Sequence, residues 1–200
     1  PRLDRLITRI PIRRIPRLSQ RDKYFAMLIE QNTSFVVVEE AESSVKGVAK
    51  MRYVSRRYTP GTLCNEPWQS TSEARYLLGI TFDQEEVDVA YIDISTDRAV
   101  SCKRIRADEL EHELTRLAPV EIVLDAALES VMADQQPSDA HIAHLKALLK
   151  GTDIFLSYVD PTDKGPTSLI VTHLSACLLD AMPILLAPTA ITQRTHLAID

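Results

Sequence analysis

Aspartates near the ends of apolar segments are the residues best suited to catalysis, because clustered carboxylates can hold two divalent metal ions about 4 Å apart. Asp83 ends one expected strand, Asp93 lies on the next strand, and Asp125 ends a later one. The first of these strands has no acidic residue in its interior. We therefore expect no two-metal centre here, and a divalent-metal nuclease is kept as an alternative function.

Other patterns for metal or nucleotide binding are incomplete. His141 and His144 are three positions apart on an expected helix, whereas a metalloprotease pair is four apart with a glutamate between. Oxygen ligands alternate from Asp93 to Asp97, but no glycine bend or later glutamate completes a cation loop. Neither GxxxxGK[ST] nor GxGxxG occurs. We expect no catalytic residue, metal or cofactor in this chain.

A basic strand followed by a turn is the other candidate site. Guanidinium groups match the oxygens of a phosphate backbone, so we predict DNA-backbone contacts from Lys50, Arg52, Arg56 and Arg57. The alternative is a cross-strand charge ladder with the acidic run at Glu39, Glu40 and Glu42. Pro60 and Gly61 follow directly and predict a type II turn, in which the glycine takes a positive φ.

Charge is distributed unevenly over a chain whose net charge is −5. Residues 1–60 hold 13 Lys and Arg against 6 Asp and Glu, and the rest hold 10 against 22. The basic part is thus suited to a polyanion. No apolar run is long enough to cross a bilayer and no signal peptide opens the chain. Three widely spaced cysteines indicate neither disulfides nor a zinc site, so we expect an intracellular protein, and Pro1 suggests a fragment or processed chain.

The elements that position these residues follow from hydrophobic periodicity. The first part predicts a helix from Ser19 to Asn32 and strands over 33–40 and 50–58. The second part predicts an antiparallel meander of strands over 75–82, 87–95 and 99–105. Helices over 107–117, 138–150 and 168–182 then alternate with strands over 121–125 and 153–159. We predict an α/β protein with an α+β first part, and a second part with the element order of the ribonuclease H-like fold.

Several segments, taken in order, resemble the MutS family of DNA mismatch-repair proteins. They are Arg56-Arg-Tyr-Thr-Pro-Gly-Thr-Leu63, Tyr76-Leu-Leu-Gly-Ile80, Ala90-Tyr-Ile-Asp-Ile-Ser-Thr96 and Pro119-Val-Glu-Ile-Val-Leu124. The resemblance implies the end of a mismatch-recognition domain over 1–62, a linker over 63–74, a connector domain of ribonuclease H-like fold over 75–187, and entry to the lever domain over 188–200. The Phe-x-Glu wedge that stacks on a mispaired base in that family is absent.

The same resemblance implies the function. The connector would couple binding of mismatched double-stranded DNA to an ATPase and to a MutL-type partner, in a protein that dimerises with a MutS-type subunit. ATP and magnesium would bind elsewhere in a longer protein, so this chain would not be an enzyme by itself. Its general look favours a mitochondrial or nuclear homologue, the mitochondrion more than the nucleus. A protein-interaction module unrelated to repair is the remaining alternative.

Overall fold

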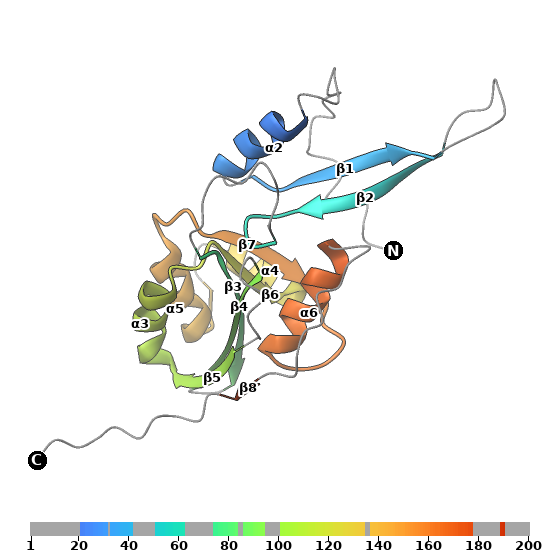
Figure 1. Ribbon diagram of the computed structural model, residues 1–200. Coiled ribbons are helices and arrows are strands. Elements are labelled where there is room, and N and C mark those ends of the chain that lie inside the picture. The colour runs from blue at the N-terminus through green and yellow to red at the C-terminus, as the bar shows by residue number, and fades with distance from the viewer. Residues whose placement is uncertain are drawn as a thin grey trace, which may run out of the picture.

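The computed structural model describes residues 21–31, 33–41, 51–62, 74–83, 86–94, 101–134, 137–177 and 189–190. Two parts follow one another along the chain (Figure 1). The N-terminal lobe, residues 21–58, consists of α2 (Arg21–Glu30) and the antiparallel strands β1 (Phe35–Glu40) and β2 (Arg52–Tyr58). The α/β domain comprises the described residues from 74 onward. Ser19, Lys50, residues 63–73 of the predicted linker, and residues 188 and 191–200 of the predicted entry to the lever domain lie outside the described residues.

A six-stranded sheet forms the centre of the α/β domain, in the order β7-β6-β3-β4-β5-β8. β3 (Tyr76–Asp83), β4 (Glu86–Asp93) and β5 (Ser101–Arg106) are the antiparallel meander. β6 (Glu121–Asp125) runs parallel to β3, and β7 (Phe155–Val159) parallel to β6. A meander continued by parallel strands beside its first strand is the ribonuclease H-like order, which confirms the predicted fold class. The pairing of β8 (Thr189–Ala190) with β5 was not predicted.

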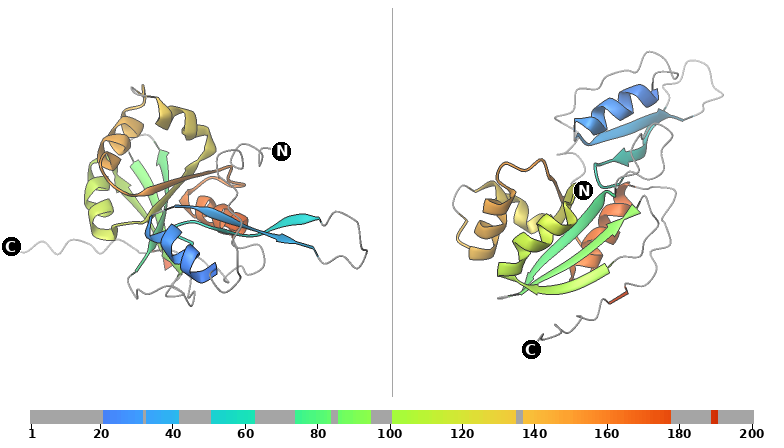
Figure 2. Two further views of the ribbon diagram at one scale, coloured as in Figure 1. Left: turned by 90° about the horizontal axis from the view of Figure 1, so that it is seen from above. Right: turned by 60° about the vertical axis from the view of Figure 1, so that its left-hand side comes forward.

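Helices cover both faces of this sheet (Figures 1 and 2). α3 (Leu110–Leu117), α4 (Glu129–Ala133) and α5 (Ala140–Leu149) pack on one face against the buried side chains of Leu78 and Ile80. α6 (Pro166–Cys177) packs on the other, against Leu77, Val123 and their neighbours. Successive side chains of β3 therefore point to opposite faces of the sheet and pack against different helices, as the two-residue period of a strand requires.

Gly79 lets α6 approach the sheet closely. A Cβ atom at this position would lie 2.4 Å from the carbonyl oxygen of Pro166 and 3.2 Å from Ile170. Such distances are well inside van der Waals contact, so only glycine fits between β3 and the first turn of α6.

Where both ends are described, the helices begin and end close to the predicted positions, with local differences; the predicted ends at Ser19, Asn32 and Met182 lie outside the described residues. The predicted helix over 107–117 opens with the 3₁₀ turn η3 (Ala107–Glu109) and ends at Ala118, whose φ is 43°. α5 is capped by Asp139 and not by Ser138, because the Asp139 carboxylate accepts from the amides of His141 and Ile142. The 3₁₀ turn η4 (Ala126–Leu128) and α4 were not predicted.

Three aromatic rings form the small core of the N-terminal lobe. Phe25, Phe35 and Tyr58 are buried, and their ring centroids lie 4.8–5.6 Å apart. The lobe also carries the exposed large apolar side chains found among the described residues: Tyr24, Met27, Val38, Met51 and Tyr53. A single helix on two strands thus leaves apolar surface uncovered. Within the described part of the chain, no helix is both long and apolar enough to cross a membrane.

Candidate functional site at the junction of the two parts

The chain passes from the lobe to the α/β domain through a buried turn at residues 59–62. Pro60 and Gly61 occupy its corners, and the amide of Thr62 donates to the carbonyl of Thr59 over 3.1 Å. The Thr62 hydroxyl closes the turn further, because it accepts from the amide of Thr59 over 2.9 Å. All four residues are buried. The turn is therefore part of the packed interior and not a surface loop.

Glu121, at the start of β6, anchors this turn. Its carboxylate is fully buried, yet it accepts hydrogen bonds from three different segments. The amide of Gly61 donates over 2.7 Å, the hydroxyl of Ser157 on β7 over 2.5 Å, and Nε2 of His173 on α6 lies at 3.0 Å. A buried carboxylate is tolerated because it is paired and hydrogen-bonded in this way.

His173 completes the junction from α6. Its Nε2 lies 3.3 Å from the Thr59 hydroxyl and 3.8 Å from Sγ of Cys177. Burial opposes the charged imidazole, but hydrogen bonds to Cys177 and Glu121 raise the pKa of His173 above its ordinary value. Burial likewise opposes ionisation of Glu121, and the hydrogen bond to His173 lowers the pKa of that carboxyl below its usual range. The two residues thus form a buried ion pair.

Gly61 is required here for a different reason from the one predicted. Its φ is not positive, as it is at Gly151 and Gly165, so the expected type II turn is wrong. A Cβ atom at Gly61 would instead lie 2.8 Å from Cδ1 of Leu77 and 3.0 Å from both Cβ and Oε2 of Glu121. The glycine therefore lets the turn lie directly on β3 and β6.

This arrangement joins the turn over 59–62 to the α/β domain and lacks the geometry of a nucleophilic site. Glu121 and Cys177 both face Nε2 of His173, whereas a triad needs its carboxylate on the other ring nitrogen. Cys177 is also fully buried. The site is suited to fixing the last turn before the α/β domain against three elements of that domain.

The aspartates of the predicted nuclease alternative have structural partners. The Asp125 carboxylate accepts from the amide of Ala127 at the start of η4. Asp83 lies 3.9 Å from Arg104 on β5. Asp93 is buried at the end of β4, where it pairs with Tyr76 at the start of β3. It therefore lies at the other end of the β3–β4 pair from Asp83. No group of three or more His, Cys, Asp or Glu able to hold a metal ion occurs among the described residues.

Among the described residues, neither histidine of α5 belongs to a group that could hold a metal ion. The His141 ring stacks on Phe82 with its centroid at 6.0 Å, and Nε2 of His144 is a buried atom without a hydrogen-bond partner in the described part of the chain.

The predicted basic residues are divided between the two faces of the hairpin. Arg56 is half-buried, with its guanidinium carbon 4.6 Å from the ring centroid of Tyr58. A bulge between the pairs Val37↔Arg56 and Val38↔Val54 reverses the alternation, so Arg52 and Arg57 share the opposite face. Exposed Arg52 also pairs with Glu40 over 3.0 Å, as the charge-ladder alternative predicted.

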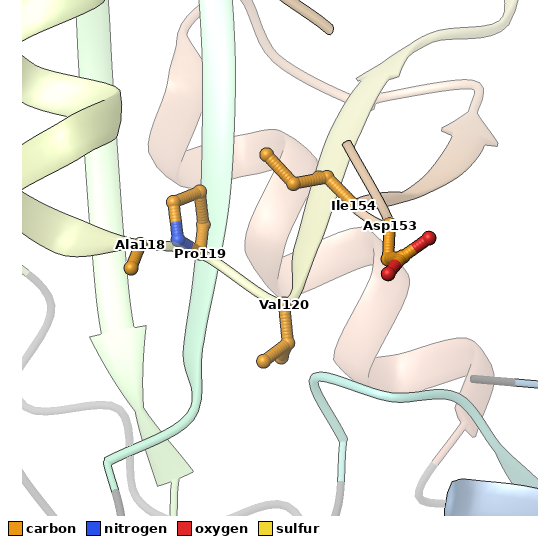
Figure 3. Close-up of a pocket in the computed structure, with 5 residues that line it drawn as sticks. All are labelled: Ala118, Pro119, Val120, Asp153 and Ile154. Atoms are coloured by element: carbon orange, nitrogen blue, oxygen red, sulfur yellow. The ribbon is translucent and has the colours of Figure 1, made fainter. Parts of the chain in front are cut away.

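A shallow depression lies beside the junction, at the ends of β6 and β7 where both strands begin (Figure 3). It has a volume of about 340 Å³ and is lined by Ala118, Pro119, Val120, Asp153 and Ile154. Its lining holds one carboxylate and otherwise apolar side chains, a composition that supplies no acid–base or nucleophilic group pair.

Glu121 and His173 were not predicted as site residues. The sequence did hold two signals for them. Glu121 starts an apolar strand and His173 lies within an apolar helix, and a charged group that is buried in this way needs a partner.

The described residues define a class: a ribonuclease H-like α/β domain with a buried ion pair that fixes the preceding turn. The model of one family, MutS domain II, matches residues 75–183. This is more than half of the chain, and the chain belongs to the MutS family.

Relatives among characterised proteins agree. The protein of Synechocystis sp. named DNA mismatch repair protein MutS is 26% identical over 125 residues, which cover 59% of this chain and 14% of that protein. Proteins of the same name from Dehalococcoides mccartyi and Trichodesmium erythraeum are each 30% identical, over 118 and 121 residues, covering 58% of this chain and 13% of theirs. The chain therefore spans about one seventh of the length of these relatives.

Among solved structures, a Fowlpox virus resolvase in complex with Holliday junction DNA has a TM-score of 0.30 and 14% identity, covering 45% of this chain and 63% of its own. The fold assignment rests on the strand order and not on this distant likeness.

Proposed function

We propose that this chain is the portion of a MutS-type mismatch-repair protein that joins the end of the mismatch-recognition domain to the connector domain. The observation that carries the proposal is the MutS domain II match over 75–183, preceded by a turn whose residues are bonded into that domain. The mismatched duplex, ATP with magnesium, the MutL-type partner and the second MutS-type subunit all belong to the longer protein.

Binding by the longer protein tests the proposal. Its affinity is measured for a duplex with one mispair and for the matched duplex of otherwise identical sequence, at several salt concentrations and with or without ATP. The proposal predicts a preference for the mispair and an ATP-dependent change in that affinity. Equal affinity for the two duplexes under all conditions would exclude a mismatch-repair role.

The role proposed for the connector is transmission. The junction bonds the turn that follows β2 to β6 and to α6, so a change in the orientation of the DNA-bound part acts on the connector directly. A buried, fully hydrogen-bonded network is rigid, which is the property that a relay between two domains needs. In this role the connector makes DNA binding depend on the bound nucleotide and on the MutL-type partner. In the other direction, DNA binding affects the nucleotide site and the binding of that partner.

We also propose that Arg57 and Arg52 contact the DNA backbone. They share one face of the hairpin, with Lys50 of the same predicted set lying outside the described residues. Arg56 is the weaker candidate of the four, because its guanidinium packs over Tyr58. The binding energy would come from phosphate contacts and carry no sequence preference.

The salt dependence of DNA affinity distinguishes these arginines. Each lost phosphate contact lowers the slope of log affinity against log salt by about 0.9. Arg57→Ala is expected to show this loss, whereas Arg104→Ala, an arginine on the connector paired with Asp88, is the matched control and should leave the slope unchanged. An unchanged slope for both Arg57→Ala and Arg52→Ala would refute the proposed contact.

A further inference from the structure

We propose that the lobe and the α/β domain are connected by a fixed joint between Tyr58 and Thr59, and that the turn over 59–62 moves with the α/β domain. A tilt of the β1–β2 hairpin would then reach α6 through Thr59 and His173 without a flexible linker on that path. This deepens the proposed function, but the joint itself is a property of the chain and can be tested without DNA.

Consecutive residues belong to two different cores. The Tyr58 ring packs against both Phe25 and Phe35 in the lobe. The side chain of the next residue, Thr59, contacts His173 of the α/β domain. Both residues are buried, so the chain crosses from one core to the other within a single peptide unit. This places the mechanical boundary four residues before the end of the recognition domain implied by the family resemblance.

The turn is fastened to the α/β domain from several directions. Gly61 donates its amide to Glu121 on β6, and Arg75, just before β3, donates to the carbonyl of Pro60 over 3.1 Å. The contact of Thr59 with His173 adds α6. At two of these positions the turn bonds through its backbone, so these bonds do not depend on the rotamers of the turn's own side chains.

Close packing removes the remaining freedom. The Cα atom of Gly61 lies so near Leu77 and Glu121 that a Cβ atom would not fit. At the other end of the path, α6 lies even closer to Gly79, where a Cβ atom would be 2.4 Å from the Pro166 carbonyl oxygen. A displacement imposed at Thr59 therefore moves α6 and the sheet together, because packed interiors transmit strain.

The lobe has a smaller hydrophobic core than the α/β domain and is therefore easier to deform. Its core is the three-ring cluster, with Leu28 and Val37 beside it, and β2 makes its main contact with the α/β domain through α6. The bulge at Ser55 interrupts the regular pairing of the hairpin. We therefore place any bending in the hairpin and none in the turn.

Amide hydrogen exchange in the full chain, measured by NMR, tests the joint. Phe35→Ala removes one ring of the lobe core, and Glu121→Gln removes the charge that holds the Gly61 amide. Glu113→Gln is the matched control, because Glu113 is also a buried carboxylate but pairs with Lys103 and Arg116 on the other face of the sheet. Thr59→Val keeps the shape of the side chain and serves if Glu121→Gln does not fold.

The proposal predicts that Phe35→Ala speeds exchange in β1 and β2 by about tenfold or more while the Gly61 and Thr62 amides remain as slow as in the unmodified chain. Glu121→Gln or Thr59→Val should speed exchange at Gly61 by about tenfold and leave β1 and β2 unchanged; Glu113→Gln should do neither.

Two results would overturn the joint: exchange at Gly61 that rises with that of β2 in Phe35→Ala, or a Gly61 amide already unprotected in the unmodified chain. If these exchange results are obtained but the longer protein does not prefer mispairs, the joint is supported and only the proposed function is refuted.

Discussion

Breaking the Glu121–His173 pair is expected to be costly, by an amount that depends on which partner remains. Removing one member of a buried ion pair typically costs about 3–5 kcal/mol, because the other charge is left unpaired. For Glu121→Gln we expect the lower end, about 3 kcal/mol, since the glutamine oxygen can still accept from the Gly61 amide. His173→Gln should cost a similar amount. The double variant should be more stable than the sum predicts by about 2 kcal/mol, because no unpaired charge remains.

The pair should also make stability depend on pH in a defined direction. The pKa of His173 is raised above 6.5 in the folded chain, so its contribution is complete below pH 6.5 and is lost as pH rises toward the folded pKa. The pKa of Glu121 is lowered below 4.5, so its contribution is complete above pH 4.5 and is lost as pH falls toward the folded pKa. The difference between the unmodified chain and the double variant should therefore be largest between these two values. Above pH 6.5 it should shrink by up to about 1.4 kcal/mol per pH unit.

Urea unfolding of the single and double variants, followed by circular dichroism from about pH 5 to about pH 9, measures these free energies. Glu113→Gln supplies the control. The pKa of Glu113 is lowered too, because the hydrogen bonds to Arg116 and Lys103 outweigh its burial, but no histidine shares the site. Its cost should stay constant from about pH 6 to about pH 9. A Glu121–His173 effect that is equally flat, or additive single effects, would refute the buried ion pair.

Other expectations follow from the packing and the acidic residues. Gly79→Ala should destabilise the chain by about 3 kcal/mol in urea unfolding, because its Cβ would meet the Pro166 carbonyl. Gly151→Ala, with no atom within 4 Å but a φ of 83°, should cost only about 1 kcal/mol, and equal costs would contradict the steric account. Millimolar Mg²⁺ or Mn²⁺ should neither raise the melting temperature nor produce cleavage of DNA, as judged by calorimetry and gel electrophoresis; metal-dependent cleavage that is lost in Asp83→Asn or Asp125→Asn would reinstate the nuclease alternative.

Local patterns were sufficient to predict the elements of the fold. Alternating apolar residues indicated the meander, and leucines at positions 110, 114 and 117 indicated α3, whose buried face they form. Because the meander precedes two strand–helix units, the fold class could be predicted as well. The short α4 and the two-residue β8 were missed, since neither has enough residues for a period to show.

Contacts between distant segments could not be predicted in the same way. The junction brings together the turn after β2 and residues of β6, β7 and α6, which no local spacing relates. The bulge in β2 reversed the faces of the arginines after Val54, and no residue type there signals a bulge. The turn at Pro60 and Gly61 was expected for its backbone conformation, but the glycine is needed because Leu77 and Glu121 leave no room for a side chain.

The most direct test of the proposed coupling uses the longer protein with Thr59→Val, which removes the hydroxyl facing His173 and keeps the side chain's shape. The measurement is the change in affinity for a mispaired duplex when ATP is added, with Arg104→Ala as the control on the surface of the α/β domain. We expect Thr59→Val to keep the affinity without ATP and to reduce the ATP-dependent change several-fold, whereas Arg104→Ala should alter neither. An ATP-dependent change of full size in Thr59→Val would contradict transmission through this junction.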